Sequence, residues 1–181
     1  MVILFYFFLH YAMAINQTNV IDIVNNYRYL NSAPPVVYNN MMDTQTQLWA
    51  QHLAETGTLI HSVSSSLYGE NLGMISGGGW ENIIKMWYDE VNNYNFSNPG
   101  FSSSTGHFTQ LVWVGTTSIS MATATSKGGI FVVMRFFPAG NVLGLFQANV
   151  LRPLPVQIPV IDKPQLIPGV PNGQYLCICD C

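Results

Sequence analysis

The chain has 181 residues, of which 49% are hydrophobic and only 8% are charged, and its formal net charge is -3. This length fits one domain with short extensions, and a chain this apolar is not expected to be disordered. With six Lys and Arg residues in total, the chain has no basic surface that would neutralise a phosphate backbone, so we expect no nucleic-acid partner.

Residues 1–14 are apolar and end in the small-x-small pattern of Ala12, Met13 and Ala14. We interpret them as a secretory signal peptide that is cleaved after Ala14, and the alternative is a buried N-terminal segment. The stretch is too short for a transmembrane span. A secreted, extracellular protein is therefore expected, with glycan on Asn16 or Asn95, which each begin an Asn-x-Ser/Thr sequon.

Apolar residues at helical spacing predict three helices. The first is capped by Thr18 or Asn19 and runs to about residue 30, the second spans residues 41–56, and the third spans residues 80–94. The side chains expected to face the core are Ile21, Val24, Tyr27 and Tyr29 or Leu30 in the first helix, Met42, Thr46, Trp49, Ala50 and Leu53 in the second, and Ile83, Ile84, Trp87 and Val91 in the third.

Strands are predicted at residues 118–126, 130–137 and 145–150, and residues 127–129 between the first two form a hairpin turn. The glycine run 77–79 is expected to be a loop. Residues 153–181 carry six prolines and predict an extended tail that ends in Cys177, Cys179 and Cys181. These thiols could bind a soft metal, pair between chains or carry lipid, and a simple tether or a dispensable end is the plainer interpretation.

Residues 106–113 read Gly-His-Phe-Thr-Gln-Leu-Val-Trp, which places an ionisable ring inside an apolar run. This octet resembles, at every position, the signature of the CAP superfamily of cysteine-rich secretory proteins, antigen 5 and pathogenesis-related proteins. Further resemblance lies in the pair Asn25 and Arg28, in the histidine-serine step at His61, and in the glycine-glutamate-asparagine turn at Glu70. The resemblance implies an α+β fold, a three-layer α/β/α sandwich with a small antiparallel sheet between helices, over residues 15–152.

The chain departs from most secreted members because it has no cysteine before residue 177, and Met134 stands where they carry one. It is most similar to the cysteine-free, Golgi-associated plant-pathogenesis-related branch. Those members carry an N-terminal myristate, which needs a glycine after the initiator, and Val2 excludes it here.

The resemblance also implies that His61, Glu70, Glu90 and His107, which we call the tetrad, line a central cleft. Two imidazoles and two carboxylates suit Zn²⁺ or another divalent metal, with His61 and His107 as ligands and Glu70 and Glu90 as ligands or as partners that orient the rings. Without a metal, the four residues would form two hydrogen-bonded pairs. In that alternative the tetrad only ties the octet to the third helix and to the turn at Glu70.

Two functions follow from the tetrad. The first is a binding module that presents the cleft, and apolar residues Leu72, Met74 and Ile75, to a lipid, a sterol or a protein partner. The second is a hydrolase in which Ser76, or alternatively Ser62, is the nucleophile, a histidine is the base and Glu70 or Glu90 orients it, within one chain or across a homodimer. The sequence contains no nucleophile elbow and no metalloprotease helix motif, so we favour the binding module over the enzyme.

Overall fold

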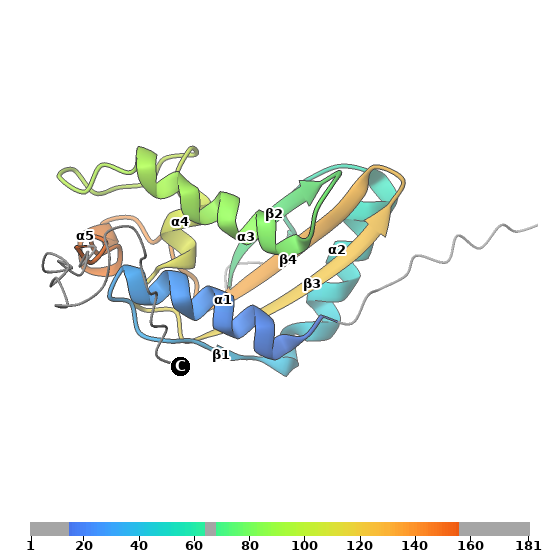
Figure 1. The fold of residues 1–181 in the computed structure, drawn as a ribbon, viewed down its shortest axis with the longest axis horizontal. Helices are drawn as coiled ribbons and strands as arrows, with labels where there is room; N and C mark the ends of the chain where they lie inside the picture. Colours follow the sequence, from blue (N-terminus) through green and yellow to red (C-terminus); the bar gives the residue numbers. More distant parts are fainter. Residues whose placement is uncertain (1–14, 64–67, 156–181) are drawn as a thin grey trace, which may run out of the picture.

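The computed structural model describes residues 15–63 and 68–155 (Figure 1). In chain order the elements are α1 (Gln17–Leu30), β1 (Val37–Tyr38), the 3₁₀ helix η1 (Asn40–Met42), α2 (Asp43–Thr56), β2 (Gly69–Ile75), α3 (Trp80–Asp89), the 3₁₀ helix η2 (Glu90–Asn93), α4 (Gly106–Leu111), β3 (Ser118–Ser126), β4 (Gly129–Phe137) and α5 (Phe146–Asn149).

The strands form one sheet in the order β1-β3-β4-β2. β3 and β4 pair antiparallel from Ser118 opposite Phe137 to Ser126 opposite Gly129, which confirms the predicted hairpin. β2 pairs antiparallel with the other side of β4, whereas β1 runs parallel to β3. The sheet is therefore mixed rather than purely antiparallel, because β1 has two residues and is too short to produce an alternating pattern in the sequence.

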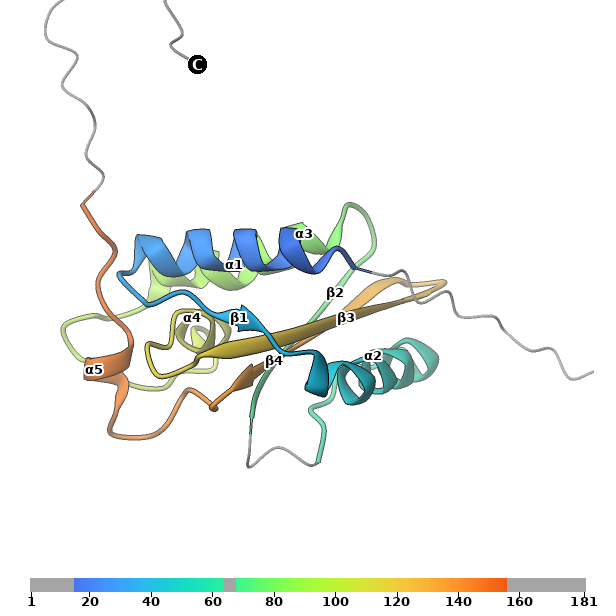
Figure 2. The same cartoon turned by 90° about the horizontal axis from the view of Figure 1, so that it is seen from below.

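The expected three layers are present. Figure 2 shows α1 and α3 on one face of the sheet and α2 on the other. Successive side chains of β3 point to opposite faces of the sheet. Ile119 packs with Val24 and Ile84 on the side of α1 and α3. Ala122 packs with Leu53 on the side of α2. Each of these apolar side chains is less than 5% exposed, so two separate hydrophobic layers hold the sheet between the helices.

The cap and the inward face of α1 differ from the prediction. Asn16 caps the helix, since its Oδ1 accepts hydrogen bonds from the backbone N–H groups of Thr18 and Asn19. The fully buried side chains are Val20, Val24 and Arg28, whereas Tyr29 is 70% exposed. The buried face of α1 includes the polar residue Arg28, so it differs from the purely apolar stripe that sequence periodicity predicts. The prediction that Tyr29 or Leu30 faces the core is therefore wrong.

The other helices follow the prediction more closely. α2 ends at Gly57, whose φ of 68° is left-handed, and it buries Thr46, Ala50 and Leu53 as expected. α3 buries Ile83, Ile84 and Trp87. It stops at Asp89, so Glu90 begins the 3₁₀ turn η2 and not the last turn of an α-helix.

Two local predictions are wrong. The predicted strand at residues 145–150 is wrong, because the chain there forms the short helix α5, from which Phe146 packs edge-on against Trp113 in a local hydrophobic cluster. The expected turn at Glu70 is part of β2, and Leu72 is consequently 7% exposed in the core, where it cannot meet a ligand. Met74 on the same strand remains 42% exposed.

The predicted signal peptide and Cys177, Cys179 and Cys181 lie outside the described residues, as does most of the predicted tail. Cleavage after Ala14 and glycan at Asn16 or Asn95 stay predictions. In the part of the chain that the structure describes, no helix combines the length and the apolar character needed to cross a membrane.

Candidate functional site

His61 and Glu70 form one pair of the tetrad. His61 follows α2 and Glu70 lies in β2, and Nδ1 of the ring is 3.0 Å from Oε1 of the carboxylate. The Glu70 carboxylate also accepts hydrogen bonds from the backbone N–H of Ser62 at 2.9 Å and from its hydroxyl at 2.7 Å. The Glu70 side chain is 2% exposed and that of His61 is 65% exposed. A buried carboxylate thus anchors an imidazole that reaches solvent.

Arg135 of β4 completes this cluster from the neighbouring strand. It stands opposite Glu70 in the sheet register, its Nε lies 3.4 Å from Oε2 of Glu70, and its Nη2 donates to the Ser62 hydroxyl. The guanidinium is buried and lies 4.5 Å from the centroid of the Tyr68 ring. Sequence reasoning assigned no role to Arg135. The available signal was a single cation within the apolar run of residues 130–137, which must find a partner when it is buried.

These contacts set the charge states of the first pair. Burial alone would raise the pKa of Glu70, but the hydrogen bonds from His61 and Ser62 and the charge of Arg135 outweigh burial and hold that pKa below 4.5. The hydrogen bond to Glu70 raises the pKa of His61 above 6.5, against the opposing effect of burial. Glu70 is therefore an anion at neutral pH.

His107 and Glu90 form the second pair. Nδ1 of His107 is 2.7 Å from Oε1 of Glu90, while Oε2 of Glu90 accepts hydrogen bonds at 3.0 Å from the backbone N–H groups of His107 and Phe108. These N–H groups lie in the first turn of α4, where a helix leaves its N–H groups without internal acceptors. Glu90 therefore fixes the ring and the start of α4 at the same time.

Two residues bring the pairs to the same end of β2. Asn71, the residue after Glu70, donates from Nδ2 to the carbonyl of His107 at 3.0 Å. The Trp87 ring stacks on the His107 ring with centroids 5.9 Å apart, and its Nε1 donates to the carbonyl of Leu72. The structure thus joins all four tetrad residues through one stretch of strand.

Arg28 holds the other end of the octet. Its guanidinium donates to the carbonyls of Pro34, Leu111, Trp113 and Thr116 at 2.8 to 3.0 Å, and the whole side chain is buried. Burial lowers its pKa to about 10. The asparagine-x-x-arginine pattern marked Arg28 in the sequence, but the acceptors on Leu111, Trp113 and Thr116 lie in a distant segment that no local pattern connects to it.

Thr109 and Gln110 of the octet form hydrogen bonds to the segment that follows β4. Thr109 donates from Oγ1 to Asn141 at 2.6 Å, and Gln110 accepts at 2.9 Å from the backbone N–H of Gly140. Asn141 in turn donates to the carbonyl of Gly106. These bonds attach α4 to the segment after β4, which keeps His107 in a fixed position.

The tetrad forms two His–Glu pairs and not one four-residue cluster. Among residues 15–63 and 68–155, no three His, Cys, Asp or Glu side chains converge closely enough to hold a metal ion. An ionised carboxylate can only accept a hydrogen bond, so a neutral imidazole beside it donates from Nδ1–H. The unprotonated Nε2 of that ring then has a lone pair that can bind a metal ion. Two nitrogen ligands are fewer than the four protein ligands of a closed structural zinc site, so a metal ion held by these two rings would keep open positions.

The structure separates Ser76 from the tetrad within one chain. Ser76 follows the last residue of β2, and at about 3.3 Å per residue the strand places it about 20 Å from Glu70. Ser62 is near, but its hydroxyl donates to Glu70, an anion with a lowered pKa that is a weak base. Within one chain, the described residues therefore place neither Ser76 nor Ser62 as a nucleophile beside a histidine base.

The hollow of about 570 Å³ in this structure lies away from the tetrad. It is lined by residues of α1, β1, α2 and β3 and includes no tetrad residue.

Comparison with known proteins matches residues 21–136 to the family described as CAP, the cysteine-rich secretory protein family. Golgi-associated plant pathogenesis-related protein 1 of Homo sapiens is 41% identical over 143 residues, which cover 76% of this chain and 93% of that protein. Protein PRY2 of Saccharomyces cerevisiae is 35% identical over 138 residues, which cover 75% of this chain and 41% of that protein.

Among solved structures, venom allergen-like protein 4 of Schistosoma mansoni superimposes with a TM-score of 0.62 at 17% sequence identity. The match covers 79% of this chain and 97% of that chain, and at this identity it shows the fold alone. The fold, the family match over residues 21–136 and the 41% identical relative agree. This chain belongs to the CAP family.

Proposed function

We propose that this CAP-family protein is a secreted binding module that takes a neutral lipid, a sterol or a protein partner at the surface formed by the two His–Glu pairs. One observation carries the proposal: both rings are bound through Nδ1 to carboxylates that also hold backbone N–H groups. The rings are thereby fixed before any ligand arrives, and fixed groups lose less entropy on binding.

Charge and composition favour a neutral ligand. The net charge is -3 with six basic residues, which gives little attraction to an anionic membrane surface. The side chains of His61 and His107 are 65% and 35% exposed, so a ligand from solvent can reach both. Secretion rests on the predicted signal peptide, whereas the name of the human relative says that that protein is Golgi-associated.

The proposal includes a divalent metal ion, Zn²⁺ in the first instance, with Nε2 of His61 and Nε2 of His107 as its ligands. When bound, the ion would supply a positive charge and open positions for a ligand oxygen. Glu70 and Glu90 would act by orienting the rings, as carboxylates do behind metal-binding histidines. The chain itself contributes the fixed rings and the buried carboxylates.

Zinc titration calorimetry tests the metal part. We expect the wild-type protein to bind Zn²⁺ and the His61→Ala, His107→Ala double variant to lose that binding. His52→Ala is the matched control, because His52 stacks on Trp49 outside the tetrad and its loss should leave binding unchanged. Protons compete with the ion for the rings, and the raised pKa of His61 means that affinity should already fall as the pH drops toward 6.5. Equal binding by the wild type and the double variant would rule the metal out.

A separate measurement tests the ligand part. The protein is purified from its own cells, and its bound lipids are extracted and identified by mass spectrometry, beside the double variant as control. A neutral lipid or sterol that is present in the wild type and depleted in the double variant supports a lipid ligand. Co-purification of one protein in the same pattern supports a protein partner. Equal recovery from both proteins would contradict binding at the tetrad.

A further inference from the structure

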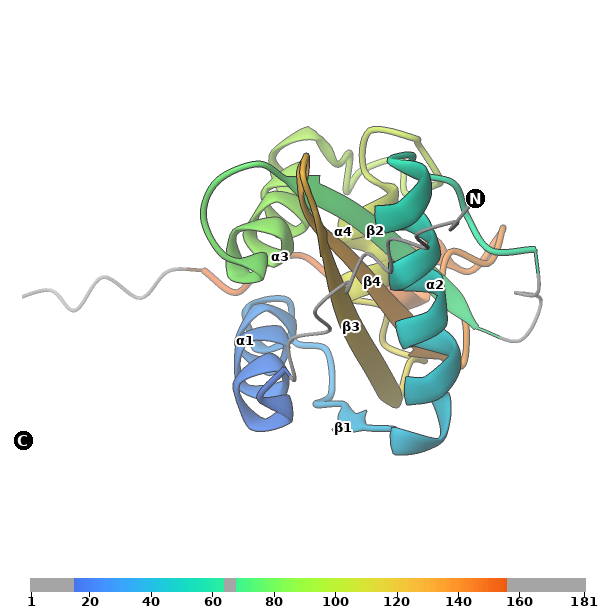
Figure 3. The same cartoon turned by 90° about the vertical axis from the view of Figure 1, so that its right-hand side faces the viewer.

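The β1 side of β3 is an unfilled sheet edge over most of its length. β1 pairs only with Ser118 and Ile119, and then the chain turns away through η1. Within the described residues, no strand lies beside β3 on this side from Ser120 to Ser126. Figure 3 shows this edge between α1 on one side and α2 on the other.

Side chains satisfy part of this edge in place of a strand. The Tyr38 hydroxyl both accepts from the backbone N–H of Met121 and donates to its carbonyl, and Gln47 donates from Nε2 to the carbonyl of Thr123. These contacts establish that Met121, Thr123 and, by alternation, Thr125 direct their backbone groups outward. The N–H of Thr123 and both backbone groups of Thr125 thus face a position that an added strand would occupy.

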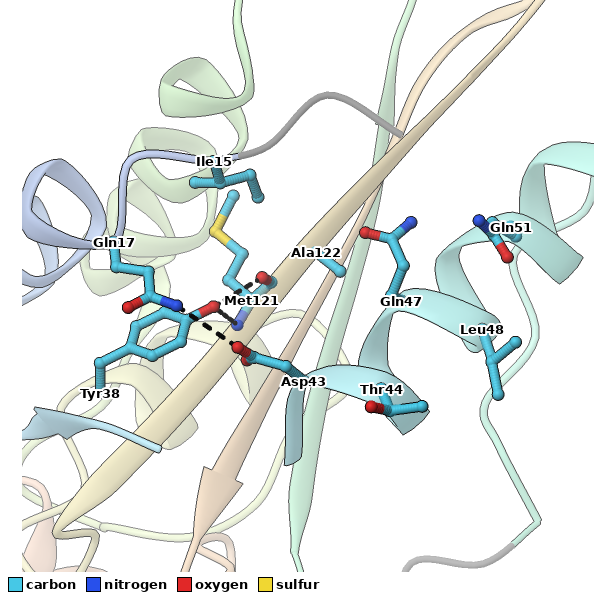
Figure 4. Close-up of a pocket in the computed structure, with 10 residues that line it drawn as sticks. All are labelled: Ile15, Gln17, Tyr38, Asp43, Thr44, Gln47, Leu48, Gln51, Met121 and Ala122. Atoms are coloured by element: carbon cyan, nitrogen blue, oxygen red, sulfur yellow. Dashed lines mark hydrogen bonds between the residues drawn. The ribbon is translucent and has the colours of Figure 1, made fainter. Parts of the chain in front are cut away.

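Two hollows follow the same edge. The larger, about 570 Å³, is lined by Met121 and Ala122 of β3, by residues of α2 and by Ile15 and Gln17 (Figure 4). The smaller, about 170 Å³, is lined by Thr123 and Thr125 together with residues at the starts of α1 and α3. Ile15 lines both hollows, so they adjoin, and we call them together the β3 groove.

The walls of the β3 groove combine amides, apolar groups and negative charge. Figure 4 shows Gln47, Leu48 and Gln51 projecting from α2 on one side of β3, and Ile15 and Gln17 on the other. The charged residues among the described lining are Asp43 and Glu81, and the lining includes no Lys, Arg or His. A second copy of this chain would bring the same carboxylates together, so its approach is disfavoured by like-charge repulsion.

We propose that the β3 groove binds an extended, basic peptide segment of a partner protein, which adds to the sheet as a strand beside Met121, Thr123 and Thr125. Main-chain hydrogen bonds to the open edge would supply affinity, as in other complexes formed by strand addition. Alternate side chains would point to α2 and to α1, so Lys or Arg side chains would complement Asp43 on the first face or Glu81 on the second. This site is separate from the tetrad and does not rest on the function proposed there.

The probe is an end-blocked, fluorescein-labelled hexapeptide, Lys-Val-Lys-Val-Lys-Val, whose binding is followed by fluorescence anisotropy. Two analogues are N-methylated, one at the three valine amides and the other at the three lysine amides. Successive N–H groups of a strand point to opposite edges, so only one analogue removes the groups that face β3. We expect that analogue to bind at least about tenfold more weakly than the parent and the other to bind like the parent. A Glu-Val-Glu-Val-Glu-Val peptide should not bind.

A matched pair of variants locates the site. Gln51→Lys places a cation in the groove, whereas Gln45→Lys places one on an exposed part of α2 outside the groove lining. We expect Gln51→Lys to weaken binding by about tenfold and Gln45→Lys to leave it unchanged. Circular dichroism and the melting temperature of each variant confirm that the fold is intact before binding is compared.

Three outcomes would overturn the proposal: absence of binding by the parent peptide, an equal effect of the two N-methylated analogues, or an equal effect of the two variants. A dimer in light scattering that the peptide does not dissociate would overturn it as well, because the groove would then be filled by a second copy.

Discussion

Replacing Arg28 by Met tests the interpretation that one buried cation holds the octet in place. Met keeps an unbranched apolar stem and removes the guanidinium that donates to four carbonyls. One of these, the carbonyl of Trp113, retains the backbone N–H of Thr116 as a second donor. For the other three, no further donor is found among the described residues.

The magnitude follows from two opposing effects. The two buried carbonyls left without a donor, those of Leu111 and Thr116, would cost about 2 kcal/mol each, and the part-buried carbonyl of Pro34 would cost about 1 kcal/mol, or about 5 kcal/mol together. Removing the guanidinium also removes the cost of burying it. The fall of its pKa from 12.5 to about 10 sets that cost at about 3 kcal/mol. The free energy of unfolding should therefore decrease by about 2 kcal/mol.

Urea denaturation followed by tryptophan fluorescence measures this change, with the linear extrapolation giving the free energy of unfolding in water. Arg152→Met is the matched control, since Arg152 lies on the exposed surface and contacts Ser97 and the Phe96 ring. We expect the control to change stability by less than about 0.5 kcal/mol. If Arg28→Met changes stability as little as the control does, Arg28 does not hold the octet and this account of the core is refuted.

Two further predictions concern Glu70. In Glu70→Gln the loss of the carboxylate should lower the pKa of His61 toward 6.5, which NMR titration of the ring measures; an unchanged pKa would show that the hydrogen bond to Glu70 does not cause the shift. The pH dependence of stability follows from the same pair. Because the pKa of Glu70 is lowered, its contribution to the free energy of unfolding is fully present above pH 4.5 and disappears as the pH falls through the lowered pKa. Because the pKa of His61 is raised, its contribution is fully present below pH 6.5 and disappears as the pH rises through the raised pKa. The stability difference between wild type and Glu70→Gln should therefore be largest between about pH 4.5 and 6.5, with the His61 share weakened by solvent, and a difference that is flat from pH 3 to 8 would contradict the assignment.

The sequence predicted most of the helices and the hairpin because the relevant patterns are local, whereas the three layers were predicted from the family resemblance. Apolar periodicity located the helices at Leu53 and at Trp87, and β-branched runs located the hairpin formed by β3 and β4. It failed where long-range contacts decide the structure. Phe146 is helical because it packs on Trp113, and β1 is a strand only because β3 lies beside it.

The candidate site was predictable in composition but not in arrangement. The motif resemblance identified His61, Glu70, Glu90 and His107, and each glutamate does contact one histidine. The pairing depends on which segments the sheet brings together, as do the contacts of Arg135 with Glu70, which come from strand register. Sequence spacing does not encode register between distant strands, so neither the partners of Arg135 nor the β3 groove could be found from the sequence.

The most direct test of the central claim is the protonation state of the two rings, read from long-range ¹H–¹⁵N NMR spectra of the histidines at pH 8. If the carboxylates of Glu70 and Glu90 hold the two rings, His61 and His107 carry their proton on Nδ1 in the neutral form, with Nε2 unprotonated, and Zn²⁺ shifts the Nε2 signals of both. A proton on Nε2 of either ring, or zinc-induced shifts confined to His52, would contradict the claim that the two glutamates present these rings to a ligand.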